Sequence, residues 1–326
     1  MEQLIADAKN ITVIQAENPD GDSLGSALAL EEIFGDMGKN VTLYCPVDIP
    51  KYLHYINGWD RVTSDLNRSA DLVIIVDTQA EILLSKVFDT PGARHFLETR
   101  SVIVIDHHET ASDLSFEHTL VCETGASTSE VIYRIAIKNN WTINQTAAEN
   151  MLAALLSDTL GLTTQSSSAD SFLVASKLVA LGASVSAIED RRRDFMKKSQ
   201  DILRYKGRLL ERIEYQLDGR LAIIHIPWEE IEEFSDQYNP SVLVLDEMRM
   251  VTDVDVAIAI KTYPDGKLTG KIRSNLPVSD SIAGFFGGGG HKYASGFRIY
   301  QSYDETYDNV IKSTQKALEN YDTEAA

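Results

Sequence analysis

The sequence predicts an α/β protein: a doubly wound, mostly parallel sheet joined by a helical connector to a smaller α+β domain. Up to about residue 186, short apolar runs alternate with amphipathic stretches, as in successive βαβ units. A charged, proline-free stretch follows at 187–216, and beyond it the pattern changes to alternating strands. With 326 residues, the chain is long enough for two cores. We therefore expect a first domain over 1–186, a connector over 187–216 and a second domain over 217–326.

The elements of the first domain follow from its apolar spacing. Strands are expected at 11–15, 41–45, 72–77 and 102–106, and helices at 24–38, 127–139, 144–157 and 169–181. Short continuous apolar runs are typical of strands buried on both faces of a parallel sheet. Ser168 can cap the last of these helices and Gly182 can end it.

The second domain shows shorter, alternating elements. Strands are expected at 220–226, 254–263, 267–273 and 296–300, and helices near 228–236 and 304–320. Between the second and third strands, Pro264 and Gly266 occupy turn positions. These two strands are therefore expected to form a hairpin.

The composition limits the possible partners. A net charge of −19 argues against nonspecific binding to long nucleic acid, including long duplexes. A small phosphorylated ligand is still compatible, because metals and a few arginines can make one cleft positive. No stretch has the roughly 18 apolar residues of a membrane span, so no membrane association is expected. Only Cys45 and Cys122 occur, without a CxxC pair, which indicates a reducing cytoplasm, with a single disulfide as the alternative.

Acids follow three of the apolar runs in the first domain. Asp20 and Asp22 come after the first run, Asp77 ends the second, and Asp106 ends the third and is followed by two histidines. Open α/β sheets bind ligands beyond the carboxyl ends of their strands. Carboxylates and imidazoles that converge there can bind Mg²⁺ or Mn²⁺. The pattern predicts metal-assisted phosphate chemistry.

Each acid alone also has an ordinary structural explanation. An Asp-Gly-Asp turn often caps a helix, here one expected to begin near Ser23, and an acid that ends a strand often caps a loop. His107 and His108 are more specific, since imidazole binds metals and imidazolium donates to phosphate oxygens. Asp158 adds another acid after an apolar stretch. Four such positions in one domain favour a common site.

A glycine-rich segment marks the second domain. Gly287, Gly288, Gly289 and Gly290 precede His291, and Arg273 and Ser274 lie upstream at the end of an expected strand. Consecutive glycines leave backbone N–H groups unshielded, as an anion-binding nest requires. The alternative is a flexible linker. The strand-like segment that follows immediately argues against a linker.

Together these motifs resemble the DHH phosphoesterase superfamily, in particular its subfamily with a glycine-rich, DHH-associated C-terminal domain. The markers span nearly the whole chain in this order: Pro19-Asp20-Gly21-Asp22 with Gly25-Ser26, Asp77, Asp106-His107-His108, Ser157-Asp158-Thr159, Arg273-Ser274 and Gly287–His291. The two-domain layout is similar to nano-RNases, which also dephosphorylate 3′-phosphoadenosine 5′-phosphate, and to dinucleotide phosphodiesterases. Family II pyrophosphatases share only the N-terminal motifs, and RecJ-type exonucleases are usually longer.

The resemblance implies two Mn²⁺ sites, with Mg²⁺ or Co²⁺ as alternatives. Asp77 would bridge the ions, Asp20 would belong to the first site, and Asp22, His107 and Asp158 would form the second. The implied chemistry is two-metal phosphoester hydrolysis. His108 would donate to the scissile phosphate, and Asp106 would orient an imidazole. Arg273 and His291, with Ser274 and the loop of Gly288, Gly289 and Gly290, would hold the substrate. The resemblance also leaves a homodimer open.

One position departs from the family pattern His-x-x-Pro-Asp, whose histidine binds the first metal. Ala16 occupies that position, and a methyl group cannot coordinate a metal. Strand alternation points Gln15 and Glu17 away from the side of Ala16, although a twist near the strand end would let Glu17 substitute. The departure allows a weaker first metal, an altered metal preference, or binding without catalysis.

Three functions are therefore compared. The leading hypothesis is a metal-dependent phosphodiesterase that cleaves short oligonucleotides or cyclic or linear dinucleotides to nucleoside monophosphates. The second is a nucleotide-binding sensor that has lost catalysis through Ala16. The third is a pyrophosphatase or a phosphomonoesterase acting on 3′-phosphoadenosine 5′-phosphate. Pyrophosphate is disfavoured, because it offers nothing for a nucleoside-binding second domain to hold.

Overall fold

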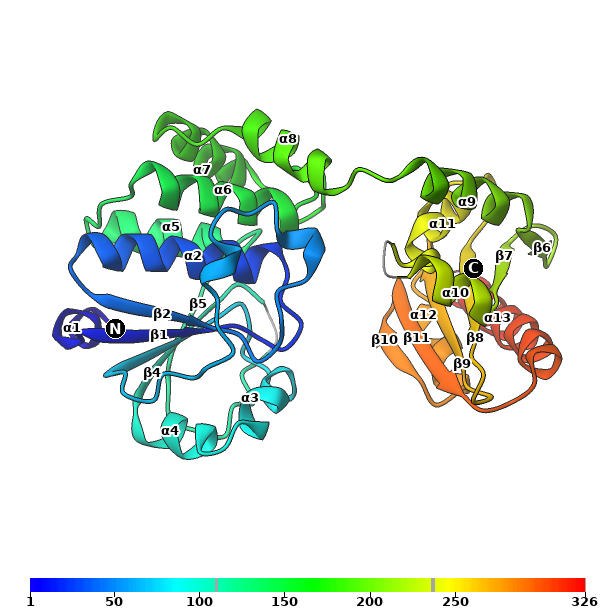
Figure 1. Cartoon of the computed structure of the whole chain (residues 1–326), viewed down its shortest axis with the longest axis horizontal. Coiled ribbons are helices and arrows are strands. Elements are labelled where there is room, and N and C mark those ends of the chain that lie inside the picture. Colours follow the sequence, from blue (N-terminus) through cyan, green and yellow to red (C-terminus); the bar gives the residue numbers. More distant parts are fainter. Residues whose placement is uncertain (109–110, 236–237, 326) are drawn as a thin grey trace. The chain divides into compact units, whose positions relative to one another are not determined.

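The chain forms two compact units in the computed structural model, Met1–Lys197 and Lys198–Ala326 (Figure 1). The structure describes residues 1–108, 111–235 and 238–325, without the side chains of His291 and Ala325. Each unit has its own sheet, with helices on both faces. The predicted fold class, an α/β domain followed by a smaller mixed domain, is confirmed.

The sheet of the first unit has five strands, and all of its pairs are parallel. The strands are β1 (Asn10–Ile14), β2 (Asn40–Tyr44), β3 (Leu72–Val76), β4 (Ser101–Asp106) and β5 (Thr119–Cys122), in the order β2-β1-β3-β4-β5. The first four match the predicted strands. The fifth strand, β5, was not predicted, because this edge strand has four residues, is only partly buried and has a short apolar run.

Alternate residues of these strands pack into two separate cores. Ile74 of β3 contributes to one core and Val73 to the other. The first core includes α2 (Gly21–Asp36), α5 (Thr128–Lys138), α6 (Gln145–Asp158) and α7 (Ala169–Ala180), which lie on one side of the sheet (Figure 1). The second core includes α3 (Ser85–Asp89) and α4 (Ala93–Thr99), on the other side. Short elements complete the unit: α1 (Glu2–Asp7), η1 (Lys51–Leu53), η2 (Trp59–Arg61) and η3 (Glu81–Leu84).

The strand order of the first sheet reverses between β1 and β3. From β1 the chain passes to β2 on one side and then returns to β3 on the other. In open α/β sheets, this reversal creates a crevice beyond the carboxyl ends of the two strands, where ligands bind. Asp20 and Asp77 follow these two strands.

The charged segment that was expected to connect the domains contains two helices. These are α8 (Val185–Phe195) in the first unit and α9 (Gln200–Glu211) in the second. Ser199 begins α9, because its hydroxyl accepts the Ile202 N–H. Among the described helices, none alone is long and apolar enough to cross a membrane; by length and composition only the bent pair α7–α8 passes that test together.

The second unit contains a six-stranded mixed sheet in the order β10-β11-β9-β8-β7-β6. The strands are β6 (Glu214–Gln216), β7 (Leu221–Ile226), β8 (Val256–Thr262), β9 (Leu268–Ser274), β10 (Gly289–His291) and β11 (Ala294–Ile299). Among the described strands of this sheet, β7 and β8 pair in parallel and the other pairs are antiparallel. The predicted hairpin between β8 and β9 is confirmed, with Gly266 in the left-handed region at a φ of 78°.

Two helical layers cover this second sheet. The core on one face includes α9, α10 (Trp228–Phe234) and α11 (Pro240–Arg249), and the core on the other includes α12 (Ser279–Phe285) and α13 (Tyr303–Ala325). The helices α11 and α12 were not predicted from the sequence. For α11 a signal was present, since Asn239 caps the helix and Pro240 occupies its first turn.

Candidate active site

The first two acids lie where α2 begins. Asp20 caps this helix, since its carboxylate accepts the N–H groups of Asp22 and Ser23 at 3.0 and 2.9 Å. The helix therefore starts at Gly21, ahead of the expected start near Ser23. This cap turns Asp22 into the first turn of the helix, where it is almost fully buried.

Two glycines let α2 and α6 approach closely. A Cβ atom at Gly21 would lie 2.1 Å from the Ser157 hydroxyl, and one at Gly25 would lie 2.6 Å from the Asn150 carbonyl oxygen. Larger residues would push the helices apart. The close packing brings Asp158, the last residue of α6, next to the start of α2.

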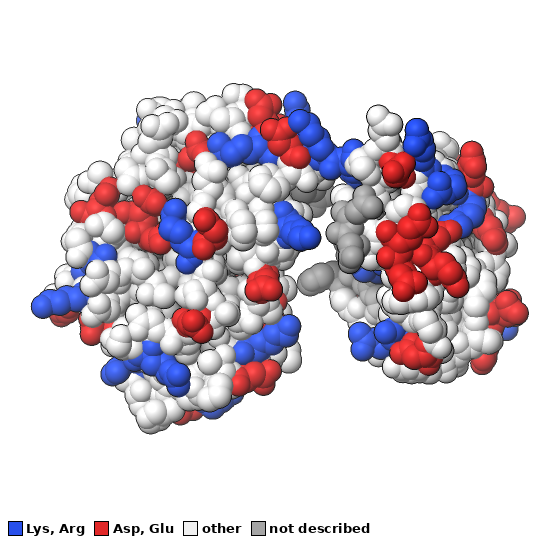
Figure 2. Space-filling view, in the orientation of Figure 1, with Lys and Arg blue, Asp and Glu red and all other residues white. Residues whose placement is uncertain are grey.

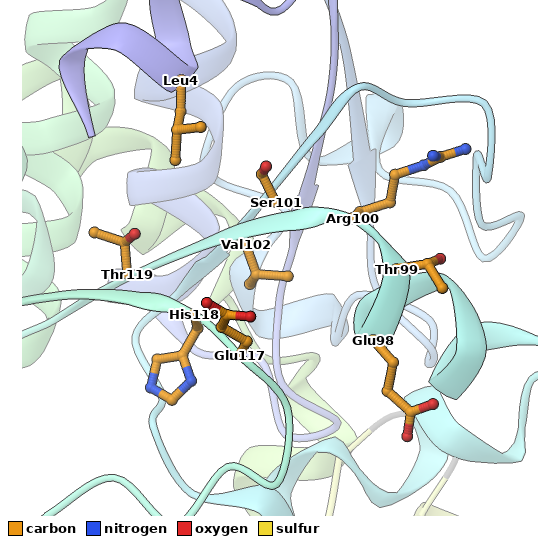
Figure 3. A pocket seen from close by; sticks show the side chains of 9 residues that line it. All are labelled: Leu4, Glu98, Thr99, Arg100, Ser101, Val102, Glu117, His118 and Thr119. Atoms are coloured by element: carbon orange, nitrogen blue, oxygen red, sulfur yellow. The ribbon is translucent and has the colours of Figure 1, made fainter.

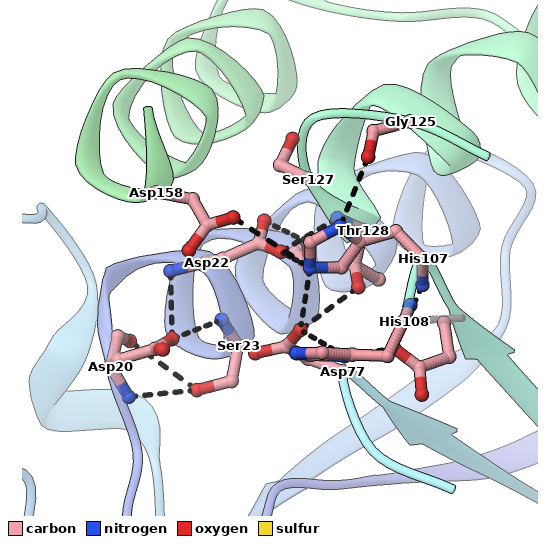
Figure 4. A network of polar contacts seen from close by, with 12 residues as sticks. Asp20, Asp22, Ser23, Asp77, His107, His108, Gly125, Ser127, Thr128 and Asp158 are labelled. Carbon is pink, nitrogen blue, oxygen red and sulfur yellow. Dashed lines mark hydrogen bonds and ion pairs between the residues drawn. The ribbon is translucent and has the colours of Figure 1, made fainter. Parts of the chain in front are cut away.

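The N-terminus of α5 holds Asp22 in place. The N–H groups of Thr128 and Ser129 donate to its carboxylate at 2.6 and 3.2 Å. The Thr128 hydroxyl also donates to Asp77 at 3.1 Å (Figure 4). Asp77 itself has a φ of 61°, which is uncommon for a residue other than glycine. This backbone conformation redirects the chain directly after β3.

His107 lies at the centre of the acids. Its Nε2 is 3.6 Å from Asp77 Oδ1, 3.6 Å from Asp158 Oδ2 and 3.9 Å from Asp22 Oδ2 (Figure 4). Its Nδ1 lies 3.1 Å from the Gly125 carbonyl oxygen and donates to it. That bond leaves the Nε2 lone pair facing the carboxylates, which is the tautomer a metal requires.

His108 is oriented by the buried Asp106. Its Nδ1 lies 2.7 Å from Asp106 Oδ1, which also accepts the N–H groups of both histidines. Burial opposes ionisation of Asp106, but these hydrogen bonds outweigh it and lower the pKa of the carboxyl. The same bond raises the pKa of His108, whose side chain is 51% exposed. The raised pKa favours the imidazolium form of His108, which can donate a hydrogen bond.

The carboxylates repel one another in a buried setting. Burial, and then the charge of Asp158, raise the pKa of Asp22 to about 6. Burial and the charges of Asp22 and Asp20 raise the pKa of Asp77 well above its ordinary value. A divalent cation would relieve this repulsion.

The donor set fits such an ion. Ligand atoms of Asp22, His107 and Asp158 all lie within 4.8 Å of one another, and Asp77 borders the same histidine. An ion about 2.1 Å from its ligands holds them roughly 3–3.5 Å apart, close to the spacing around His107. Three carboxylates and one imidazole suit Mn²⁺ or Mg²⁺.

The surroundings of Asp20 offer fewer donors. Ala16 is buried and contributes no ligand atom. Glu17 does not substitute, because its carboxylate accepts the Ser85 hydroxyl at 2.5 Å and the Lys86 N–H at 2.9 Å. Asp20 and the shared Asp77 are therefore the carboxylates left for a first metal within the described residues.

In the second unit, Arg273 and Ser274, which were both predicted to bind substrate, have side chains on opposite faces of the sheet. They are neighbours in β9, where successive side chains alternate between the two faces. Ser274 is buried, and its hydroxyl lies 2.8 Å from that of Ser279. The side chain of His291 lies outside the described part of the structure, although its backbone belongs to β10.

The glycine run has a packing role. Gly287 and Gly288 donate their N–H groups to carbonyls at the end of α12, so neither amide is free to bind an anion. A Cβ atom at Gly288 would lie 2.3 Å from the Gly296 carbonyl oxygen, and one at Gly290 would lie 2.6 Å from Ser295. At Gly289, by contrast, a Cβ atom would meet no atom within 4 Å.

A pocket of about 360 Å³ lies at the opposite edge of the first sheet (Figure 3). Its lining includes Ser101 and Thr119, which begin β4 and β5. Asp106 lies at the carboxyl end of β4. This pocket is therefore separate from the carboxylate cluster.

Sequence reasoning missed the residues that hold the ligands. Thr128 and Gly125 position Asp22, Asp77 and His107 through bonds made by their backbone or hydroxyl. The only available signal was Ser127 followed three residues later by Glu130, a helix-start pattern.

The fold and the cluster define a phosphoesterase with a candidate divalent-metal centre. Residues 10–157, which lie in the first unit, match the DHH family, N-terminal domain. It is 26% identical over 285 residues to the probable bifunctional oligoribonuclease and PAP phosphatase NrnA of Streptococcus mutans, covering 86% of this chain and 87% of that protein.

Two further comparisons concern the first unit and the fold. Over 161 residues the chain is 30% identical to the probable manganese-dependent inorganic pyrophosphatase of Enterococcus faecalis, which covers 46% of this chain and 48% of that protein. An exopolyphosphatase-related protein from Bacteroides fragilis has the same fold, with a TM-score of 0.81 and 23% identity over 98% of this chain and 94% of that one.

Proposed function

We propose that the protein is a Mn²⁺-dependent phosphodiesterase that hydrolyses short oligonucleotides or dinucleotides to nucleoside monophosphates. The observation that carries the proposal is the placement of His107 Nε2 between Asp22, Asp77 and Asp158. Support for the substrate comes from the relative in Streptococcus mutans, whose name includes oligoribonuclease and PAP phosphatase. Support for manganese comes from the name of the relative in Enterococcus faecalis.

In this proposal, different residues bind the metal, donate the proton and bind the substrate phosphate. Asp22, Asp77, His107 and Asp158 would hold a metal that activates water and neutralises phosphate charge. Asp106 would keep His108 protonated and aimed, and His108 would donate to a phosphate oxygen. Arg273 would bind a substrate phosphate through its guanidinium.

The charge distribution favours a short substrate. Acidic and basic side chains are mixed over both units in the view of Figure 2. With a net charge of −19, the chain is poorly suited to long nucleic acid. A few cations around one ligand are sufficient for a dinucleotide.

A second candidate is a nucleotide sensor without catalysis. The observation that favours it is the pair Ala16 and Glu17, neither of which supplies a donor beside Asp20. Such a protein would keep the metal formed around His107 and bind nucleotide without cleaving it.

The test is hydrolysis of 5′-phosphorylated diadenylate by the purified protein with Mn²⁺, followed by chromatography of AMP. Parallel reactions contain 3′-phosphoadenosine 5′-phosphate or pyrophosphate, and EDTA provides the metal-free control. We expect AMP from the dinucleotide and no phosphate from pyrophosphate. Absence of turnover across di- and trinucleotides, together with nucleotide binding, would establish the sensor instead.

A further inference from the structure

One peptide group lies between His107 and a buried acid. Its carbonyl, from Gly125, accepts the Nδ1–H of His107 at 3.1 Å (Figure 4). Its N–H, from Ala126, donates to the Glu130 carboxylate at 3.1 Å. The peptide bond is trans, so this carbonyl and this N–H share a plane and point in opposite directions. The position of the Glu130 carboxylate therefore sets the direction in which the carbonyl meets the histidine.

The Glu130 carboxylate is itself held at both oxygens. The side chain is fully buried in α5. The hydroxyl of Ser171 in α7 donates to Oε2 at 2.9 Å, and the Arg134 guanidinium pairs with Oε1. Arg134 also donates to the Thr124 carbonyl oxygen at 2.7 Å. The chain is therefore bonded to side chains of α5 on both sides of Gly125.

An ordinary role at the start of a helix does not account for these bonds. In a capping box the acid accepts the N–H of the cap residue, which is Ser127 in α5. Glu130 instead accepts the N–H one residue earlier, from Ala126. Stability alone does not require the charges either, because apolar groups of similar volume often replace a buried ion pair without loss.

The charge of Glu130 also acts on His107 through the peptide group. Hydrogen bonds in a chain polarise one another, so an N–H that donates to a carboxylate makes its carbonyl a stronger acceptor. A strong acceptor at Nδ1 maintains the Nδ1–H tautomer and makes Nε2 a better metal ligand. This Nε2 is the atom that lies among Asp22, Asp77 and Asp158.

We propose that Glu130 is a positioning residue of the metal centre, which acts through the peptide group between Gly125 and Ala126 to hold His107 in the tautomer and orientation that bind a divalent cation. The inference rests on the proposed function for the metal. The tautomer of His107, however, is a property of the metal-free protein and can be measured by itself.

The test compares the wild type with E130Q and with the control E149Q. Glutamine keeps the shape of glutamate and removes its charge. The control makes the same substitution in the same unit, at an ion pair between Glu149 of α6 and Arg191 of α8. Circular dichroism checks that each variant is folded.

Two quantities are measured on the full chain. Calorimetric titration gives the affinity for Mn²⁺ alone. Long-range ¹H–¹⁵N NMR in EDTA, at alkaline pH where imidazole is neutral, gives the tautomer of each histidine. The spectrum of H107Q assigns the signals of His107.

We expect E130Q to weaken Mn²⁺ binding about tenfold, the low end of the range for loss of a group that orients a metal ligand. In metal-free E130Q, His107 should shift from the Nδ1–H towards the Nε2–H tautomer. E149Q should match the wild type in both measurements.

The proposal is overturned if E130Q keeps the wild-type tautomer or the wild-type Mn²⁺ affinity, or if E149Q weakens Mn²⁺ binding as much as E130Q. If E130Q does not fold, R134K replaces it with the same expectations, because one amine cannot bond both Glu130 and Thr124 as the planar guanidinium does. A wild type that binds no Mn²⁺ would refute the proposed metal centre, and the NMR comparison would still decide whether Glu130 sets the tautomer.

Discussion

Gly21 and Ser157 are so close that a Cβ atom on the glycine would overlap the serine side chain, at 2.1 Å from its hydroxyl oxygen. The contact joins the start of α2 to the end of α6. Asp22 and Asp158 follow these two residues directly. The packing of two helices therefore sets the distance between two candidate metal ligands.

This contact predicts that G21A impairs both stability and metal binding. The added methyl must displace the Ser157 side chain or separate the helices, and overpacking of this kind destabilises by about 1–3 kcal/mol. Urea denaturation and Mn²⁺ titration measure the two effects. The matched control is G35A on the same helix, where a Cβ atom meets nothing within 4 Å. That variant should gain about 0.5–1 kcal/mol, and a loss in G35A equal to that in G21A would contradict the role of the contact.

The sequence could supply the acids of the site but not the groups that hold them. Asp20, Asp77 and Asp106 each follow an apolar run, and strand order then brings them together. Thr128 was not predicted from the sequence, because its bond to Asp22 joins residues 106 positions apart. The bond exists only once α5 has packed.

Ser274 shows a second reason why the sequence does not place the side chains of a site. It adjoins Arg273 in sequence and was therefore expected to bind substrate with it. In a strand, however, neighbours point to opposite faces, and the Ser274 hydroxyl bonds to Leu276 and Ser279 inside the fold. Sequence proximity therefore does not bring the two side chains together, because the period of two in a strand separates them.

Ala16 predicts one tightly bound metal per chain. Ligand atoms of Asp22, His107 and Asp158 lie within 4.8 Å of one another, and Asp77 borders the same histidine. Among the described residues, neither Ala16 nor Glu17 supplies a further donor beside Asp20. We expect about one Mn²⁺ per chain after gel filtration, measured by elemental analysis, and about two in A16H, because an added imidazole supplies a ligand of the kind Mn²⁺ accepts. A16L controls for side-chain size at this buried position and should remain at one. Two tightly bound ions in the wild type would contradict this account.

His108 is expected to act on substrate without holding the metal. In H108Q, turnover of diadenylate should fall about 100-fold or more, the range for loss of a general acid, while Mn²⁺ affinity changes little. The reason is that His108 Nδ1, the atom nearest Asp77, is already bonded to Asp106 and the side chain is half exposed. By contrast, His107 Nε2 faces three carboxylates. Steady-state kinetics and metal titration on the same preparation separate the two effects. Loss of Mn²⁺ from H108Q would instead make this histidine a ligand.

The buried amine of Lys261 should make the free energy of unfolding of the protein depend on pH. Its pKa is about 8 in the folded protein against an ordinary 10.5, chiefly because of burial and then of Lys271. The unfolded chain therefore holds this proton more tightly, and the destabilisation is complete below pH 8 and disappears as the pH rises towards 10.5. Replacing the amine with an uncharged side chain should remove this effect.

We therefore expect K261M to be more stable than the wild type at pH 7, and expect the difference to shrink by pH 10. The scale is about 1.4 kcal/mol for each tenfold change in proton affinity. Loss of the bond to Asn239 and residual contact with water reduce the expected gain to about 1–2 kcal/mol. Urea denaturation at both pH values measures it, with K316M as the exposed control that should show no pH-dependent difference. A K261M variant less stable than the wild type at pH 7 would show that the Asn239 bond outweighs the buried charge.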